Sequence, residues 1–211
     1  LTPPDQMIEI SAVLSGRVNA TIVAELLARG SSAVGLSLAD GFLTSSITTT
    51  RYPFNPGRVG EVVGGDAKLV HTLLHAGFLP IISSVAVDAG GDLLNVNADD
   101  AAAAIARIVG ATRLIFLTDV SGVLDQDGAL ISKITAPEVA TLIEQGVIYG
   151  GMIPKINNAL ATATETGICV VIAGWRDKNI LARLGDGESV GSTILPPSIA
   201  SLYTTHSTLS R

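Results

Sequence analysis

The sequence predicts an α/β protein, a three-layer αβα sandwich around a mainly parallel central sheet. Two observations support this fold. Short apolar runs alternate along the chain with segments whose apolar residues recur at helical spacing. The apolar runs, such as residues 114–117 and 168–173, are continuous rather than alternating, as expected for strands that are covered on both faces.

Composition narrows the class of protein. At 211 residues the chain can bury roughly 70% of its unfolded surface without disulfides or a structural metal. The net charge is −6 and no basic run occurs, so no nucleic acid partner is expected. The longest apolar stretches, 79–82 with 85–87, are too short to span a membrane. The single cysteine, Cys169, is expected to be buried and suits a reducing cytoplasm. His71 and His75 lack a recognisable third ligand, so no protein-held metal is predicted.

The N-terminal half begins with a helix-start signal, because the hydroxyl of Thr2 precedes two prolines. The helix can bend or break at Ser15-Gly16, and it ends at Gly30. The elements expected next are a strand over 33–38, an exposed antiparallel strand over 45–52, an extended segment over 60–63, a helix over 66–77 and a buried strand over 79–87.

The second half continues the alternation. Asp99 and Asp100 open a helix that runs to residue 108, and carboxylates suit a helix N-terminus. The elements expected next are a strand over 114–117, one or two helices over 132–146, a helix over 156–167, a strand over 168–173, a short helix over 175–184 and a strand over 193–195. The lobe boundary falls near residues 110–113, which gives lobes 1–112 and 113–195 and a polar tail, 196–211.

Polar residues gather at the ends of two of these elements. Asn95 belongs to a polar loop before the helix that Asp99 opens, and residues 118–122 follow the buried strand 114–117. Open α/β sheets bind ligands at the C-terminal ends of their parallel strands. We therefore expect the two acidic loops to face one cleft.

A glycine pair and a lysine indicate phosphate binding. Gly150 and Gly151 open a helix that carries Lys155 in its first turn, where free N–H groups and positive charge favour phosphate. Asp119 is placed to orient that lysine or to hold a metal-bound phosphate. Spacing alone leaves open that Lys155 is a solvated helix residue and Asp119 a loop cap. The absence of G-x-G-x-x-G and Walker A sequences weighs against dinucleotide and P-loop enzymes.

Three motifs together resemble the amino acid kinase family. They are NVNAD at 95–99, LTDVSGVLD at 117–125 and GMIPK at 151–155, and the opening LTPPDQ and closing GSTI fit the same family. The likeness runs in unbroken order from residue 1 to about residue 195. It implies the amino acid kinase fold, with an acyl amino acid on the N-terminal lobe and ATP on the C-terminal lobe. In particular it resembles the members that use MgATP to phosphorylate the γ-carboxylate of N-acetyl-L-glutamate, in arginine biosynthesis.

The resemblance implies roles for individual residues. Asn95 and Asn97 would bind the acyl amino acid. Lys155 would neutralise charge on the transferred phosphoryl group, and Asp119 would position the catalytic lysines. Asp99 would act through structure and charge rather than as a base, because the acceptor carboxylate is already ionised at neutral pH. The ATP site would be lined by Asp119, Val120, Ser121, Gly122, Val123, Leu124, Val147, Ile148, Tyr149, Gly150, Gly151 and Met152, with Mg²⁺ bound through the nucleotide.

The chain departs from the family pattern at its start. The sequence contains no strand ending in Lys-x-Gly-Gly, no later Gly-Gly pair and no substrate-binding arginine at the family positions. We therefore expect the protein to have a further N-terminal segment. Without that segment, the isolated 211-residue chain is expected to have no kinase activity and to aggregate. Two alternatives stay open: a kinase for carrier-protein-linked aminoadipate or glutamate, and a catalytically incompetent regulatory homologue. The resemblance also implies a cytoplasmic homodimer or hexamer of dimers, and allows a regulatory signalling protein as partner.

Overall fold

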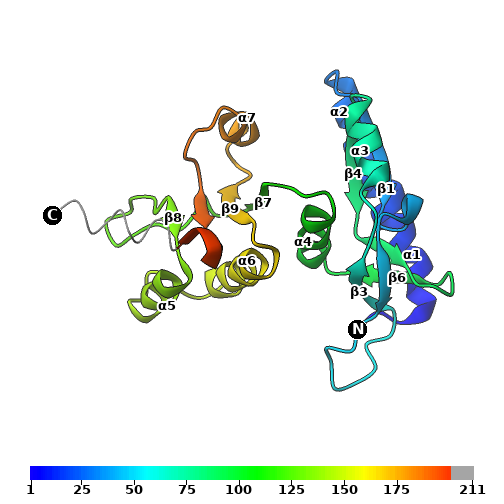
Figure 1. Ribbon diagram of the computed structural model, residues 1–211, viewed down its shortest axis with the longest axis horizontal. Coiled ribbons are helices and arrows are strands. Elements are labelled where there is room, and N and C mark those ends of the chain that lie inside the picture. The colour runs from blue at the N-terminus through cyan, green and yellow to red at the C-terminus, as the bar shows by residue number, and fades with distance from the viewer. Residues whose placement is uncertain (201–211) are drawn as a thin grey trace. The chain divides into compact units, whose positions relative to one another are not determined.

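The computed structural model describes residues 1–200 and divides the chain into two compact units, Leu1–Gly110 and the residues from Ala111 onward. Each unit packs helices on strands, which confirms the α/β class (Figure 1). The division into a lobe for the acyl amino acid and a lobe for ATP stays a prediction. Most of the predicted polar tail, 196–211, lies outside the described residues.

One helical stretch opens the first unit. It comprises η1 (Pro4–Gln6), α1 (Met7–Ser11), the π-helix η2 (Ala12–Val18) and α2 (Asn19–Ala28). The predicted bend at Ser15-Gly16 is therefore a π-helical segment within a continuous helix. By length and composition the stretch Pro4–Ala28 is apolar enough to cross a membrane, which the search for continuous apolar runs did not detect.

Polar contacts hold this helix on a sheet. The side-chain amide of Asn19, a buried residue, donates hydrogen bonds to the carbonyl oxygens of Leu36 (3.2 Å) and Ile81 (2.8 Å). Those two residues belong to β1 (Ala33–Ser37) and β4 (Leu79–Ser83), which pair in parallel. A buried core helix of a soluble protein and an N-terminal signal sequence both meet the same length and composition criteria, and only 6% of this window is buried.

A second sheet of the first unit carries a candidate substrate residue. Its order is β2 (Ser45–Thr48), β3 (Val59–Gly64), β6 (Leu93–Val96) and β5 (Val85–Val87), and only the β3–β6 pair is parallel. The predicted single strand over 79–87 is thus two strands in different sheets. Asn95 lies within β6, so its assignment to a loop was wrong. The helical elements of this part are η3 (Asp40–Phe42), α3 (Lys68–His75) and α4 (Ala98–Ile108).

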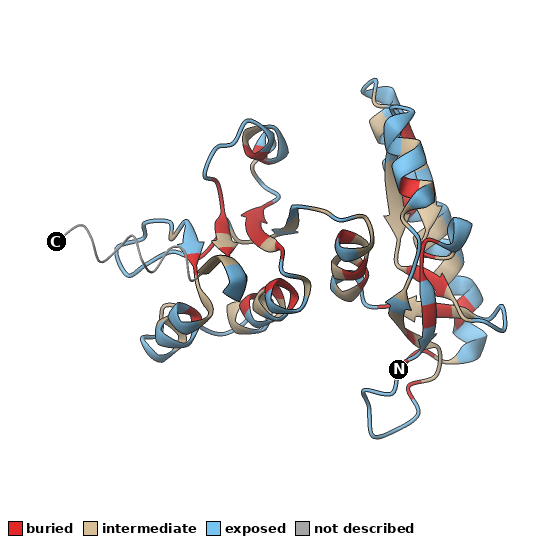
Figure 2. Ribbon diagram, viewed as in Figure 1, coloured by how far each residue is buried: buried red, intermediate tan, exposed pale blue. Residues whose placement is uncertain are grey.

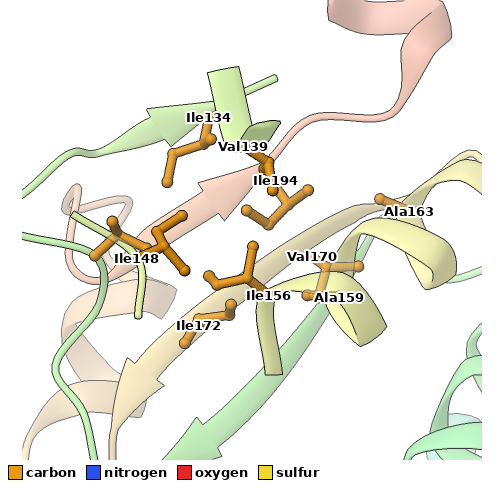
Figure 3. Packing of buried hydrophobic residues seen from close by; sticks show 10 residues of the cluster. Ile134, Val139, Ile148, Ile156, Ala159, Ala163, Val170, Ile172 and Ile194 are labelled. Atoms are coloured by element: carbon orange, nitrogen blue, oxygen red, sulfur yellow. The ribbon is translucent and has the colours of Figure 1, made fainter. Parts of the chain in front are cut away.

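The second unit is a three-layer sandwich around a mixed sheet. The strand order is β7 (Arg113–Thr118), β9 (Cys169–Gly174), β10 (Ser192–Ile194) and β8 (Lys133–Ile134), with only the β9–β10 pair antiparallel. Helices α5 (Ala136–Glu144) and α6 (Met152–Thr166) contribute to a core with Val170 and Ile172 of β9. The alternate residues Val171 and Ala173 pack with α7 (Ile180–Gly185) on the other face. The buried residues follow these strands and the inner sides of the helices (Figures 2 and 3).

Several predicted bounds in this unit need correction. The segment predicted as helix over 132–146 begins with β8, and only residues from Ala136 are helical. The predicted helix over 175–184 starts at Ile180, because residues 175–179 form turns. Helix α6 begins at Met152 rather than at residue 156. Cys169 is half-buried at the start of β9, not buried as expected.

Candidate functional site

The loop after β7 is placed by the pairing of two parallel strands. Thr118 of β7 lies opposite Gly174 of β9, so the residues that follow both strands reach the same edge of the sheet. The N–H of Trp175 donates to the carbonyl of Thr118 at 2.9 Å. The Thr118 hydroxyl accepts from the N–H of Val120 at 3.1 Å, which turns the chain sharply after the strand. Asp119 is therefore held at the C-terminal edge of the sheet.

Buried contacts fix the far side of this loop. The N–H of Val123 donates to the hydroxyl of Ser192 (2.8 Å), which in turn donates to the carbonyl of Ile131 (2.7 Å). Gly122 has φ +141°, and a Cβ there would lie 2.6 Å from Leu130 Cδ1. A side chain at this position would be strained, because φ is positive and the Cβ would also lie 3.1 Å from the backbone nitrogen of Ser192. Gly122 and Val123 thus shape the loop.

Lys155 of α6 and Asp119 of the loop after β7 form an ion pair. Helix α6 begins after Gly150, which has φ +55°, and Lys155 lies at the end of its first turn. The Lys155 Nζ donates a hydrogen bond to Asp119 Oδ1. That hydrogen bond, followed by a backbone hydrogen bond and the charge of Lys155, lowers the pKa of the Asp119 carboxyl below its ordinary value. Asp119 is therefore ionised at neutral pH.

Replacing Lys155 with methionine should raise the pKa of Asp119 towards its ordinary value. The pKa is lowered in the folded protein, so the ion pair is complete at neutral pH and is lost as the pH falls through the lowered pKa. A pH titration of the Asp119 carboxyl carbon by NMR measures this change. Lys178→Met, at an exposed residue, is the matched control. Identical Asp119 titrations in the Lys155 variant and the unmodified protein would show that the pair does not form.

A cavity of about 540 Å³ adjoins the pair. Eight of the twelve residues predicted to line the ATP site border it: Asp119, Val120, Ser121, Gly122, Leu124, Val147, Tyr149 and Met152. The side chains of Val123 and Ile148 are buried in the core instead, so only their backbone is available to a ligand. Gly150 and Gly151 precede α6 without bordering the cavity. Sequence reasoning did not assign Asp125, Gln126, Gly128 and Gly146 to the site, because turn composition alone does not show which turns face a cavity.

The other predicted site residues lie in the first unit, at the junction of β6 and α4. The Asn95 side-chain amide donates to the hydroxyl of Thr2 at 3.2 Å. Asn97 is the N-cap of α4, because its side-chain oxygen accepts from the N–H groups of Asp99 (2.9 Å) and Asp100 (3.3 Å). Asp99 lies exposed in the first helical turn, as the sequence predicts. The side-chain oxygen of Asn97 is thus already occupied by two hydrogen bonds, and a substrate-binding role for Asn97 stays a prediction.

Metal ligands do not gather in the described part of the chain. Among residues 1–200, no group of three or more His, Cys, Asp or Glu side chains is arranged to hold a metal ion. His71 Nε2 lies 3.1 Å from the carbonyl oxygen of Val109, and its ring contacts that of His75 edge to face.

The fold and the lysine–carboxylate pair beside a cavity are those of a small-molecule kinase. The chain belongs to the amino acid kinase family, whose model matches residues 2–174. It is 46% identical over 194 residues to the acetylglutamate kinase of Edwardsiella ictaluri, covering 92% of this chain and 74% of that protein. The acetylglutamate kinase of Serratia proteamaculans is 46% identical over 197 residues, with the same coverage. The resemblance seen in the motifs is confirmed.

Solved structures share the fold. The crystal structure of smu.665 from Streptococcus mutans UA159 is 30% identical, with a TM-score of 0.69, over 92% of this chain and 73% of that one. An N-acetylglutamate synthase from Neisseria gonorrhoeae, complexed with coenzyme A and N-acetyl-glutamate, is 23% identical with a TM-score of 0.71. It covers 90% of this chain and 43% of that one, and at this identity it supports the fold alone.

Proposed function

We propose that this protein transfers the γ-phosphoryl group of ATP to the γ-carboxylate of N-acetyl-L-glutamate, giving N-acetyl-L-glutamyl 5-phosphate and ADP. This is the second step of arginine biosynthesis. The observation that carries the proposal is the pairing of Lys155 with Asp119, in a chain 46% identical to two acetylglutamate kinases. A carboxylate oxygen attacks the γ-phosphorus and the bond to the β–γ bridging oxygen breaks. No base is needed, because the carboxylate is ionised at neutral pH.

In the proposed reaction Lys155 neutralises negative charge on the transferred phosphoryl group. Phosphoryl transfer depends on positioning and on stabilising the charge that spreads over the phosphoryl oxygens. Asp119 holds the Lys155 ammonium at the sheet edge, where it meets that charge. Mg²⁺ would be held mainly by the nucleotide phosphates, because the Asp119 carboxylate already accepts a hydrogen bond from Lys155. The metal would supply further charge neutralisation there.

The cavity next to the pair suits the adenosine part of ATP. Its volume, about 540 Å³, is within the range of small-molecule sites. Val120, Leu124, Val147 and Met152 give it apolar walls, and the exposed Tyr149 offers a ring for stacking. The adenine would lie among these side chains with its phosphates directed towards Lys155.

Replacing Asn95 with alanine should raise the KM for N-acetylglutamate about 5-fold and leave the KM for ATP unchanged. The reason is the loss of one hydrogen bond to the acyl amino acid, worth about 1 kcal/mol. Steady-state kinetics with each substrate varied in turn measures this. Asn55→Ala, in an exposed turn, is the control. If Asn95→Ala lowers only the thermal midpoint and leaves both KM values as they were, the residue is structural through its contact with Thr2.

A coupled assay for ADP release tests the proposed reaction. The protein should turn over N-acetylglutamate far faster than glutamate or aspartate. Faster turnover of a carrier-protein-linked aminoadipate or glutamate would favour the carrier-linked kinase instead. ATP binding without turnover of any acceptor would indicate a regulatory homologue.

We also propose a cytoplasmic homodimer or hexamer of dimers, with a regulatory signalling protein as a further partner. Exposed apolar side chains on the opening helix support self-association: Ile8, Ile22 and Leu27 are 72%, 43% and 53% exposed. Such side chains in one helix often mark an interface. Light scattering coupled to size-exclusion chromatography gives the oligomeric state, and a monomer at micromolar concentration would rule out the assembly.

A further inference from the structure

We propose that Arg176 is a second cationic ligand of the nucleotide phosphates, acting with Lys155 on either side of the Asp119 loop. This inference rests on the proposed function and adds a residue to its site. Arg176 lies outside the three motifs that resemble the family.

A second cavity borders the same loop. Its volume is about 470 Å³, and Asp119, Ser121, Leu124 and Gly128 line it as they line the first cavity. Arg176 lines only the second cavity. Two cavities therefore border the loop that carries Asp119, and only the second is lined by arginines, Arg176 and Arg183.

Strand register places Arg176 close to Asp119. Thr118 and Gly174 are opposite each other in the parallel pair β7–β9, so Asp119 and Arg176 follow at the same edge, one and two residues further on. The hydrogen bond from Trp175 N–H to the Thr118 carbonyl keeps the two chain segments together. The positive charge of Arg176 also lowers the pKa of Asp119, although its contribution is the smallest and that of Lys155 is the largest.

The guanidinium of Arg176 is available to a ligand. The carboxylates of Asp177 and Glu188 are bound to a different arginine: Asp177 accepts from Arg183 Nη1 at 2.7 Å and Glu188 from Arg183 Nε at 2.8 Å. Within residues 1–200, no carboxylate lies within 4.0 Å of Arg176. Its contact is with the ring of Trp175, whose centroid is 5.5 Å from the guanidinium carbon. An exposed arginine without a carboxylate partner retains donors for a phosphate.

This arrangement predicts which part of the nucleotide depends on Arg176. Two phosphate oxygens match the paired N–H groups of a guanidinium, so ATP and inorganic tripolyphosphate should both contact Arg176. Adenosine carries no phosphate and should not. Arg176 would act by binding and orienting the phosphates, while Lys155 meets the charge that develops during transfer.

Titration calorimetry and the fluorescence of Trp175 test this proposal in the protein. Trp175 is the only tryptophan, so its emission reports directly on the neighbourhood of Arg176. ATP and tripolyphosphate should change the emission, whereas adenosine should leave it unchanged. Arg176→Gln should raise the Kd for ATP and tripolyphosphate by roughly 10- to 100-fold, as expected for charge-assisted hydrogen bonds, with the Kd for adenosine unaltered. Arg176→Lys, which keeps the charge but not the paired donors, should recover part of the affinity.

Matched variants separate this inference from the proposed function. Lys178→Gln removes the same charge two residues further along the same turn and should leave every Kd unchanged. Equal effects of Arg176→Gln and Lys178→Gln would overturn the role of Arg176, since they would reflect net charge alone. ATP binding that weakens in Lys155→Gln but not in Arg176→Gln would also overturn it, while the proposed function stands. An unmodified protein that binds neither ATP nor tripolyphosphate would overturn the proposed function itself.

Discussion

Replacing Lys155 with alanine should lower kcat for phosphoryl transfer by about 10²-fold or more. The ammonium group is held by Asp119 at the edge of the sheet, where negative charge grows on the phosphoryl oxygens in the transition state. An interaction that is stronger in the transition state than in the ground state affects kcat more than KM. Steady-state kinetics at saturating ATP and N-acetylglutamate measures the loss.

A matched lysine provides the control for this experiment. Lys178 is exposed, and Lys178→Ala removes one positive charge from the same unit. It should leave kcat unchanged. Circular dichroism should show that both variants are folded, because Lys155 is partly exposed and its aliphatic stem fills no core position. A folded Lys155→Ala variant with unchanged turnover would remove Lys155 from the site.

Replacing Ile156 with alanine should destabilise the protein by about 2–5 kcal/mol, because it creates a cavity in a packed core. Ile156 follows Lys155 in α6 and is 0% exposed. Its side chain lies among Ile134, Ile148, Ile172 and Ile194 (Figure 3). Chemical denaturation followed by circular dichroism gives the free energy of unfolding.

A smaller truncation at the same residue gives the control for the stability measurement. Ile156→Val removes one methylene and should cost about 0.5–1.5 kcal/mol. The alanine variant should lose ATP affinity only as far as it unfolds, because Ile156 faces the core and does not line either cavity. A loss below about 0.5 kcal/mol for Ile156→Ala would mean that α6 is not held on the sheet by this core.

Local sequence signals predicted the parts of the site that depend on a single strand or helix. The continuous apolar run before Thr118 indicated a buried strand, and the polar residues after it indicated its functional end. The glycine pair before α6 indicated the helix start that carries Lys155. The assignment of Lys155 and Asp119 to one site came from the resemblance, and the structure brings these two side chains into contact.

Local sequence patterns did not predict which strands pair with one another. Residues 79–87 have one continuous pattern, yet β4 and β5 pair with partners in different sheets. Strand β6 is short and contains Asn95, a residue type with low β-strand propensity. The segment is a strand because it pairs with β3 and β5. Arg176 carries no motif at all. Its nearness to Asp119 follows from the register of β7 and β9, which no local pattern encodes.

Trapping of the acyl phosphate with hydroxylamine tests the central claim most directly. Hydroxylamine converts N-acetyl-L-glutamyl 5-phosphate into a hydroxamate that iron(III) colours. The unmodified protein with MgATP and N-acetylglutamate should form hydroxamate at the rate of ADP release, and Lys155→Ala should form it at least about 10²-fold more slowly. ADP release without hydroxamate, or equal hydroxamate formation by the two proteins, would contradict phosphoryl transfer at the Lys155–Asp119 pair.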